Sequence, residues 1–208
     1  MNFVENGASD VIFKCSDTKK NIFLIGDSIR KGYCAYTKNA LKDKAEVFYF
    51  DDNCRSSQYI IFSMKKWAGM FDDTSKIDVV QFNCGQWDTA HWNGYELSLT
   101  SESEYAKNIR MIIFQIKKFF PNATIVFATT SPMNPDGQNS YNPRSNAEVT
   151  RYNQIALEIT TELNVPVIDV NTFMRDWDSP KFKDSCHLID SSYEELGNFV
   201  AEQLENFI

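Results

Sequence analysis

A chain of 208 residues, 43% hydrophobic and 14% aromatic, has enough apolar material for a core and is expected to form one domain over residues 1–208. Its formal net charge of −7 argues against nucleic acid as a partner, because phosphate binding depends on clustered Lys and Arg. The first residues contain no basic start followed by a long apolar run, so neither a signal peptide nor a membrane span is expected.

The predicted elements alternate between short apolar runs and longer amphipathic ones. In chain order they are a strand at 21–25, a weaker helix at 30–41, a strand at 45–50, a helix at 56–69, a strand at 77–82, a helix at 101–119, a strand at 123–128, a helix at 147–163, a strand at 165–169 and a helix at 191–207. Each strand is almost continuously apolar, as is typical of strands that are covered on both faces.

This alternation predicts parallel strands joined by right-handed crossovers. We therefore expect an α/β fold, a three-layer α/β/α sandwich of about five parallel strands in the flavodoxin-like order. Ligands of such sheets bind beyond the carboxyl ends of the strands. The loop at 131–145 is the longest irregular stretch and is expected to form a rim or lid of the site.

The first predicted strand runs directly into Gly26-Asp27-Ser28. A hydroxyl at this point lies close to a helix N-terminus, where free backbone N–H groups favour negative charge. A nucleophilic serine needs such donors for the oxyanion that forms during acyl transfer. The alternative is that Asp27 or Ser28 only caps the helix, and the triplet alone favours this alternative.

A nucleophilic serine also needs a base and a group that orients the base. The chain has only two histidines, His91 and His187, and each ends a D-x-x-H segment, beginning at Asp88 and Asp184. The residues alone do not choose between them. Because the cysteines are not clustered either, no metal site and no cofactor are expected.

The GDSI motif at residues 26–29 and the DSCH motif at residues 184–187 together resemble the GDSL/SGNH hydrolase family. The resemblance extends from Ile22 to about Leu204. It implies the three-layer fold, with Ser28 as nucleophile, His187 as general base and Asp184 as the group that fixes the imidazole.

The family also implies two oxyanion donors, a glycine after the second strand and an asparagine after the third, often in G-x-N-D. This sequence departs from both. Cys54 falls at the position of the glycine, where its backbone N–H is expected to serve. Asn83 is expected to supply the side-chain amide, with Gln86 as the fallback. Alternatively, Asn83 closes a turn with Gly85.

The expected function is that of a serine esterase that hydrolyses a small acyl ester in two steps. Aromatic side chains follow the third strand, and rings at a rim can stack on sugar faces: Trp87, Trp92 and Tyr95, with His91 among them. This favours a carbohydrate ester, such as an acetylated sugar, as the substrate. The alternative is that the rings only pack the loop onto the core. No membrane partner is expected, and the sequence gives no indication of the oligomeric state.

Two other classes of protein fit parts of the pattern. One is a non-catalytic ligand-binding protein, or a degenerate member of the same fold. The other is a cysteine hydrolase that uses Cys84 or Cys186. Cys186 is expected to be poorly placed, because neighbours in an extended segment point to opposite faces.

The five cysteines are widely scattered and include no C-x-x-C pair: Cys15, Cys34, Cys54, Cys84 and Cys186. This pattern favours reduced thiols in a cytoplasmic protein, although a secreted protein without its signal would look the same.

Overall fold

The computed structural model describes residues 12–137 and 141–208. Its sheet has five parallel strands in the order β2-β1-β3-β4-β5, which confirms the predicted flavodoxin-like order. The strands are β1 Lys20–Ile25, β2 Ala45–Tyr49, β3 Val79–Phe82, β4 Thr124–Ala128 and β5 Val167–Ile168. Because Ile25 pairs with Phe82 and Phe82 pairs with Phe127, the ends of β1, β3 and β4 lie at one edge of the sheet.

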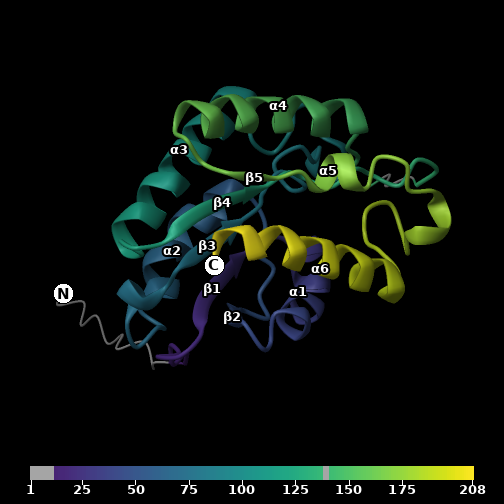
Figure 1. Ribbon diagram of the computed structural model, residues 1–208. Helices are drawn as coiled ribbons and strands as arrows, with labels where there is room; N and C mark the ends of the chain where they lie inside the picture. Colours follow the sequence, from purple (N-terminus) through teal and green to yellow (C-terminus); the bar gives the residue numbers. More distant parts are fainter. Residues whose placement is uncertain (1–11, 138–140) are drawn as a thin grey trace, which may run out of the picture.

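The helices form the two outer layers (Figure 1). They are α1 Ser28–Ala40, α2 Ser57–Ala68, α3 Glu102–Phe119, α4 Asn146–Glu162, α5 Val170–Phe173 and α6 Asp190–Leu204. Short 3-10 turns add η1 Thr74–Lys76, η2 Trp92–Gly94, η3 Ser179–Lys181 and η4 Glu205–Phe207. The turns and α5 were not predicted, because three or four residues are too few to show a period.

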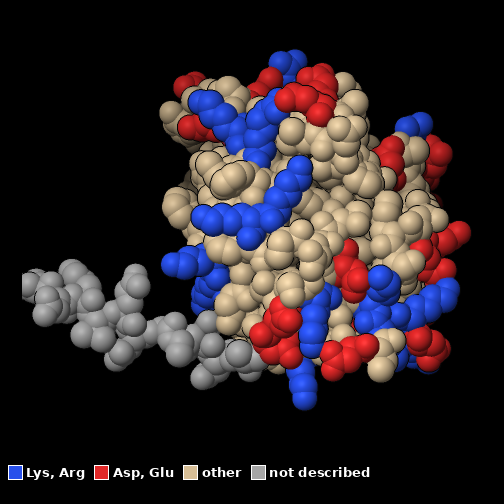
Figure 2. Space-filling view, turned by 60° about the vertical axis from the view of Figure 1, so that its left-hand side comes forward, with Lys and Arg blue, Asp and Glu red and all other residues tan. Residues whose placement is uncertain are grey.

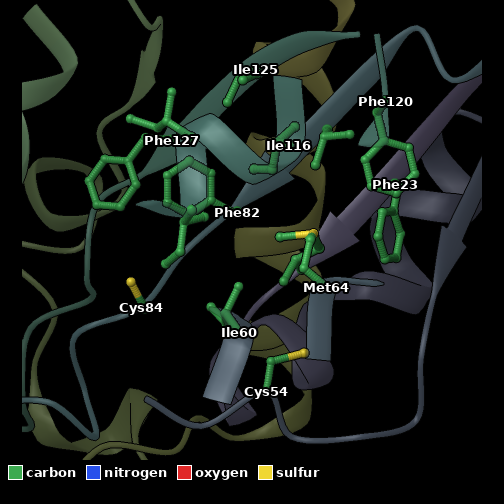
Figure 3. Packing of buried hydrophobic residues seen from close by; sticks show 14 of the residues in the cluster. Phe23, Cys54, Ile60, Met64, Phe82, Cys84, Ile116, Phe120, Ile125 and Phe127 are labelled. Atoms are coloured by element: carbon green, nitrogen blue, oxygen red, sulfur yellow. The ribbon is translucent and has the colours of Figure 1, made fainter. Parts of the chain in front are cut away.

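Alternate residues of the strands enter two separate hydrophobic clusters. Phe23 and Ile25 of β1 pack in the cluster beneath α2, α3 and α4, part of which Figure 3 shows. Ile22 and Leu24 pack in the cluster beneath α1 and α6. Burial on both faces explains why these strands are almost continuously apolar in sequence.

The last strand is shorter than the predicted range 165–169. Val165 already packs in the cluster beneath α4, and Asp169 is the N-cap of α5, where its side chain accepts a hydrogen bond from the Thr172 N–H. Polar capping therefore ends the strand at Ile168.

Charges of both signs are interspersed on the face drawn in Figure 2, around a largely uncharged centre. Within residues 12–137 and 141–208, no helix combines the length and the apolar character needed to cross a bilayer.

Candidate active site

Ser28 is the first residue of α1 and lies at the carboxyl edge of the sheet. Asp27 caps the helix, since its Oδ1 accepts a hydrogen bond of 3.0 Å from the Ile29 N–H. The helix cap and a nucleophilic hydroxyl are therefore compatible, because the two roles fall on neighbouring residues, Asp27 and the half-buried Ser28. As the first helical residue, Ser28 has a backbone N–H with no partner inside the helix.

Gly26 allows this turn to pack closely against the end of β3. A Cβ at this position would lie 1.9 Å from Asn83 Oδ1 and 2.7 Å from Arg30 Cβ. The glycine of the motif is thus required by space.

Ser28, His187 and Asp184 form a continuous chain of hydrogen bonds. Ser28 Oγ lies 2.8 Å from His187 Nε2, and His187 Nδ1 lies 2.8 Å from Asp184 Oδ2. Since a carboxylate accepts, Nδ1 carries the proton and donates, which leaves Nε2 of the neutral ring free to accept from the serine. This is the arrangement of a nucleophile, a base and an orienting group.

The Asp184 carboxylate is held by backbone as well as by the imidazole. Its Oδ1 accepts hydrogen bonds from the N–H groups of Cys186 (2.9 Å) and His187 (2.8 Å). Partial burial alone would raise the pKa of Asp184, but these bonds hold it below its usual value. The carboxylate is therefore ionised when it orients the ring.

Cys186 does not point away from the histidine, so this part of the sequence prediction is wrong. Its Sγ lies 3.7 Å from His187 Nδ1, because the turn that closes on Asp184 replaces the extended segment that was assumed. Contact with Cys186, followed by the bond to Asp184, raises the pKa of His187 to about 9, although burial opposes the shift. The thiol adjoins the nitrogen that faces Asp184, whereas Ser28 adjoins the other nitrogen.

Asp184, Cys186 and His187 form the one group in the described part of the chain whose side chains lie close enough together to hold a metal ion. Ligand atoms of Asp184, Cys186 and His187 lie within 4.8 Å of one another. An ion on Nδ1 would displace the bond between the imidazole and Asp184, so metal binding and the hydrogen-bonded chain exclude each other.

The other candidate cysteine, Cys84, is fully buried, and burial raises the pKa of its thiol well above the usual value. Its Sγ contacts Tyr105 Oη in the core. A thiol in this environment is inert.

Cys54 is held by its backbone and by its side chain. Its N–H donates a 3.0 Å hydrogen bond to the Gly26 carbonyl, and its side chain lies in the hydrophobic cluster (Figure 3). To stabilise an oxyanion, the Cys54 N–H would have to exchange this bond. The next residue, Arg55, has a left-handed φ of 49°, and its N–H donates to Asn53 Oδ1 at 2.9 Å. A conformation that favours glycine thus falls on an arginine, which no sequence signal indicated.

Asn83 follows β3 directly and is buried beside Gly26. Burial raises the pKa of Asp27, and the side chain of Asn83 acts against that shift. Asn83 Oδ1 has no hydrogen-bond partner among the described residues. Asn83 does not line the cavity at Ser28.

Gln86, the fallback, also has an engaged amide. Its Nε2 lies 2.9 Å from the Ser131 carbonyl and 3.2 Å from Ser131 Oγ, and its Oε1 accepts from Arg144. Neither Asn83 nor Gln86 lines the cavity at Ser28, so the choice of Asn83 over Gln86 as the side-chain donor stays a prediction.

His91 and Asp88 are in separate environments. His91 Nδ1 donates to the Tyr95 carbonyl (2.9 Å), and Nε2 lies 2.5 Å from Glu148 Oε1. Asp88 is fully buried and accepts bonds from Ser57; burial raises the pKa of Asp88 to about 6. The second D-x-x-H segment does not bring its own carboxylate to its histidine.

A cavity of about 230 Å³ opens at Ser28. It is lined by Ser28, Asn53, Trp87, Trp92, Asn142, Arg144 and residues 184–187. The rings of Trp87 and Trp92 stack with centroids 5.1 Å apart and planes at 26°. The predicted rim is thus aromatic, although Tyr95 does not line it and His91 binds Glu148 instead.

The long loop before α4 brings two side chains that sequence reasoning did not identify, Asn142 and Arg144. The expectation of a rim or lid at 131–145 falls partly on residues 138–140, which lie outside the described residues. Asn153 on α4 fixes the backbone just before this loop: its side chain accepts a hydrogen bond from the Thr130 N–H (2.8 Å) and donates one to the Thr130 carbonyl (2.9 Å).

A parallel α/β/α sandwich with a serine, a histidine and a carboxylate joined at its carboxyl edge has the architecture of a serine hydrolase. The sequence profile of the GDSL-like Lipase/Acylhydrolase family matches residues 24–194. The chain belongs to this family and is a serine hydrolase that acts on ester bonds.

Solved structures share the fold at low identity. An acetyl xylan esterase is 19% identical with a TM-score of 0.67, covering 89% of this chain and 98% of its own. A lipase/acylhydrolase from Enterococcus faecalis is 18% identical with a TM-score of 0.70, covering 90% and 96%. A carbohydrate acetylesterase from Sinorhizobium meliloti is 13% identical with a TM-score of 0.70, covering 91% and 100%. No curated protein matches the chain in sequence.

Proposed function

We propose that this protein is an esterase that removes a small acyl group, such as acetyl, from a carbohydrate, with Ser28, His187 and Asp184 as its catalytic triad. The observation that carries the proposal is the pair of 2.8 Å hydrogen bonds that joins these three side chains.

In the first step, His187 Nε2 takes the proton of Ser28 Oγ while the oxygen attacks the ester carbonyl carbon. The tetrahedral intermediate carries the negative charge on the former carbonyl oxygen. When it collapses, the protonated imidazole gives its proton to the leaving alcohol, and the acyl group stays on Ser28. Asp184 stabilises the imidazolium throughout.

In the second step, His187 takes a proton from water, whose oxygen attacks the acyl carbon. Collapse of this intermediate returns the proton to Ser28 Oγ and releases the carboxylic acid. The Ser28 N–H is the backbone donor that the helix leaves free for the oxyanion, and Asn83 is the proposed side-chain donor. Removal of one such donor is expected to lower turnover on the order of a hundredfold.

The walls of the cavity favour a sugar as the alcohol part. Stacked indole rings offer a flat apolar surface, and the amides of Asn53 and Asn142 line the same space. A cavity of about 230 Å³ is smaller than the usual sites of drug-sized ligands, which supports a small reacting unit. Sugar acetylesterases among the structures with the same fold are consistent with this choice.

Turnover of p-nitrophenyl acetate by the wild type and by Ser28→Ala tests the proposal, followed by a panel of acetylated monosaccharides. We expect hydrolysis by the wild type, and a rate that is at least about a thousandfold lower in Ser28→Ala. If the wild-type protein hydrolyses none of these esters, the result would instead support the non-catalytic alternative. Ser28→Ala with normal activity would place the chemistry elsewhere.

A further inference from the structure

Arg144 is the one arginine among the residues that line the cavity at Ser28. It lies at the end of the loop before α4, one residue ahead of the N-cap Ser145. Its Nη1 donates to Gln86 Oε1 at 3.1 Å, and Gln86 is itself buried and bonded to Ser131. The guanidinium is therefore held in place by a neutral acceptor on a rigid support.

No carboxylate of residues 12–137 and 141–208 forms an ion pair with Arg144. Its Nε is buried and has no hydrogen-bond partner in the part of the chain that the structure describes. Every other described arginine lies elsewhere, for example Arg110 and Arg151 in exposed ion pairs. A cation that is half-buried and not neutralised by direct contact is costly unless a ligand supplies the missing charge.

The acidic groups near the cavity already have other partners. Asp184 is bonded to His187. Asp27 is fully buried behind the first turn of α1, where the charge of Arg30 acts on it more strongly than that of Arg144 does. His187 also lines the cavity, but it is paired with Asp184, so Arg144 is the cationic group there that no described carboxylate pairs with.

We infer that the substrate carries a carboxylate, and that Arg144 binds it while the ester carbonyl lies at Ser28. This inference rests on the proposed function and names the class of substrate: an O-acyl ester of an acidic sugar, such as a uronic acid. A guanidinium is the planar, permanently charged group that pairs with a carboxylate. A phosphate dianion would bring two charges, whereas His187 is already paired with Asp184 and Arg144 alone offers the cavity a cation without such a partner among the described residues.

The surrounding residues fit such a sugar. Trp87 and Trp92 supply the stacked surface, and the polar side chains of Asn53 and Asn142 line the same cavity. We expect selectivity for acidic over neutral sugars, because the carboxylate of an acidic sugar forms an ion pair with the Arg144 guanidinium and a neutral sugar does not.

Two matched sugars test the inference: 3-O-acetyl glucuronic acid and 3-O-acetyl glucose, which differ only in a carboxylate against a hydroxymethyl group. Free glucuronate and free glucose are compared in parallel as competitive inhibitors of p-nitrophenyl acetate hydrolysis, a readout that does not depend on the position of the acyl group. We expect the wild type to prefer the acidic member of each pair by about tenfold or more.

In Arg144→Gln the ratio of activity or affinity for the acidic over the neutral sugar should fall toward one, mainly through changes in KM and Ki. Arg144→Lys should keep part of this preference. Arg175→Gln, which removes an exposed arginine outside the cavity, should keep it in full. Equal losses toward acidic and neutral sugars in Arg144→Gln would overturn the inference, since they are the signature of an arginine that only fastens the loop to Gln86.

The outcomes separate this inference from the proposed function. If p-nitrophenyl acetate is hydrolysed through Ser28 but the wild type shows no preference for glucuronate, the inference fails and the esterase stands. If p-nitrophenyl acetate is not hydrolysed either, the proposed function fails.

Discussion

His187 bonds to Ser28 through one ring nitrogen, and its other nitrogen contacts both Asp184 and Cys186. The contacts on this second side decide at which pH the imidazole is neutral and can act as a base. Because the pKa of His187 is raised to about 9, the neutral ring is the minor form at pH 7.

We therefore expect kcat/KM for p-nitrophenyl acetate to rise about tenfold per pH unit below pH 9 and to level off above it. Cys186→Ala should move the midpoint to lower pH, because the contact that contributes most to the raised pKa is lost. Cys34→Ala, a buried cysteine outside the site, is the matched control and should leave the midpoint in place. A wild-type profile that is flat from about pH 6 to 8 would contradict the assignment.

At the residue scale, the sequence predicts those site residues that belong to a recognisable motif and misses those that lie outside one. Ser28, His187 and Asp184 lie in two short motifs, and the structure brings their side chains into contact. Arg144 lies in an irregular loop, where no pattern shows which side chain faces the cavity. Cys186 was misplaced because the local turn, and not the strand-like alternation, sets its direction.

At the scale of elements, Asp88 holds the start of α2. Its carboxylate accepts hydrogen bonds from the Ser57 N–H (3.1 and 3.2 Å) and from Ser57 Oγ (2.5 Å), and Asn108 Nδ2 donates to that same Oγ. Ser56, the N-cap residue, makes no side-chain cap bond. A distant buried carboxylate thus replaces the local cap.

Asp88→Ala should lower the free energy of unfolding by about 1–3 kcal/mol, because it leaves the buried Ser57 donors without acceptors. Urea denaturation followed by circular dichroism measures the change. Asp43→Ala, at an exposed carboxylate, should change stability by less than about 0.5 kcal/mol. Equal effects of the two substitutions would show that Asp88 is not a cap.

Strands and long helices were predictable because their hydrophobic patterns extend over many residues. The helix at α1 was the weakest prediction, and the structure starts it at Ser28, before the predicted residue 30. The cap by Asp27 marks this start, but the same residue type also fits a simple turn. The hydrogen-bond donors to the oxyanion were less predictable than the triad, since any non-proline residue has a backbone N–H and the sequence does not show which one faces the site.

At the scale of the whole molecule, the site depends on the packing of α1 against α6. Helix α1 carries Ser28, and the segment just before α6 carries His187. Gly197 lets the two helices approach: a Cβ there would lie 2.6 Å from Tyr36 Cβ and 2.9 Å from the Tyr33 carbonyl. Figure 1 shows the two helices side by side.

Gly197→Val should therefore force the helices apart and lower the free energy of unfolding by roughly 1–3 kcal/mol. It should also lower kcat for p-nitrophenyl acetate, because Ser28 and His187 move relative to each other. Asn198→Val places the same side chain on the exposed face of α6 and is the matched control. Full activity and stability in Gly197→Val would show that the contact between the helices does not set the geometry of the site.

The central claim is that Ser28 and His187, 159 residues apart in the chain, act as one catalytic unit. Labelling by a fluorophosphonate, with the modified peptide mapped by mass spectrometry, tests it most directly in the wild type, His187→Ala and His91→Ala. We predict rapid modification of Ser28 in the wild type, modification slowed at least a hundredfold in His187→Ala, and a nearly unchanged rate in His91→Ala. Labelling that persists in His187→Ala but is lost in His91→Ala, or that falls on another residue, would contradict it.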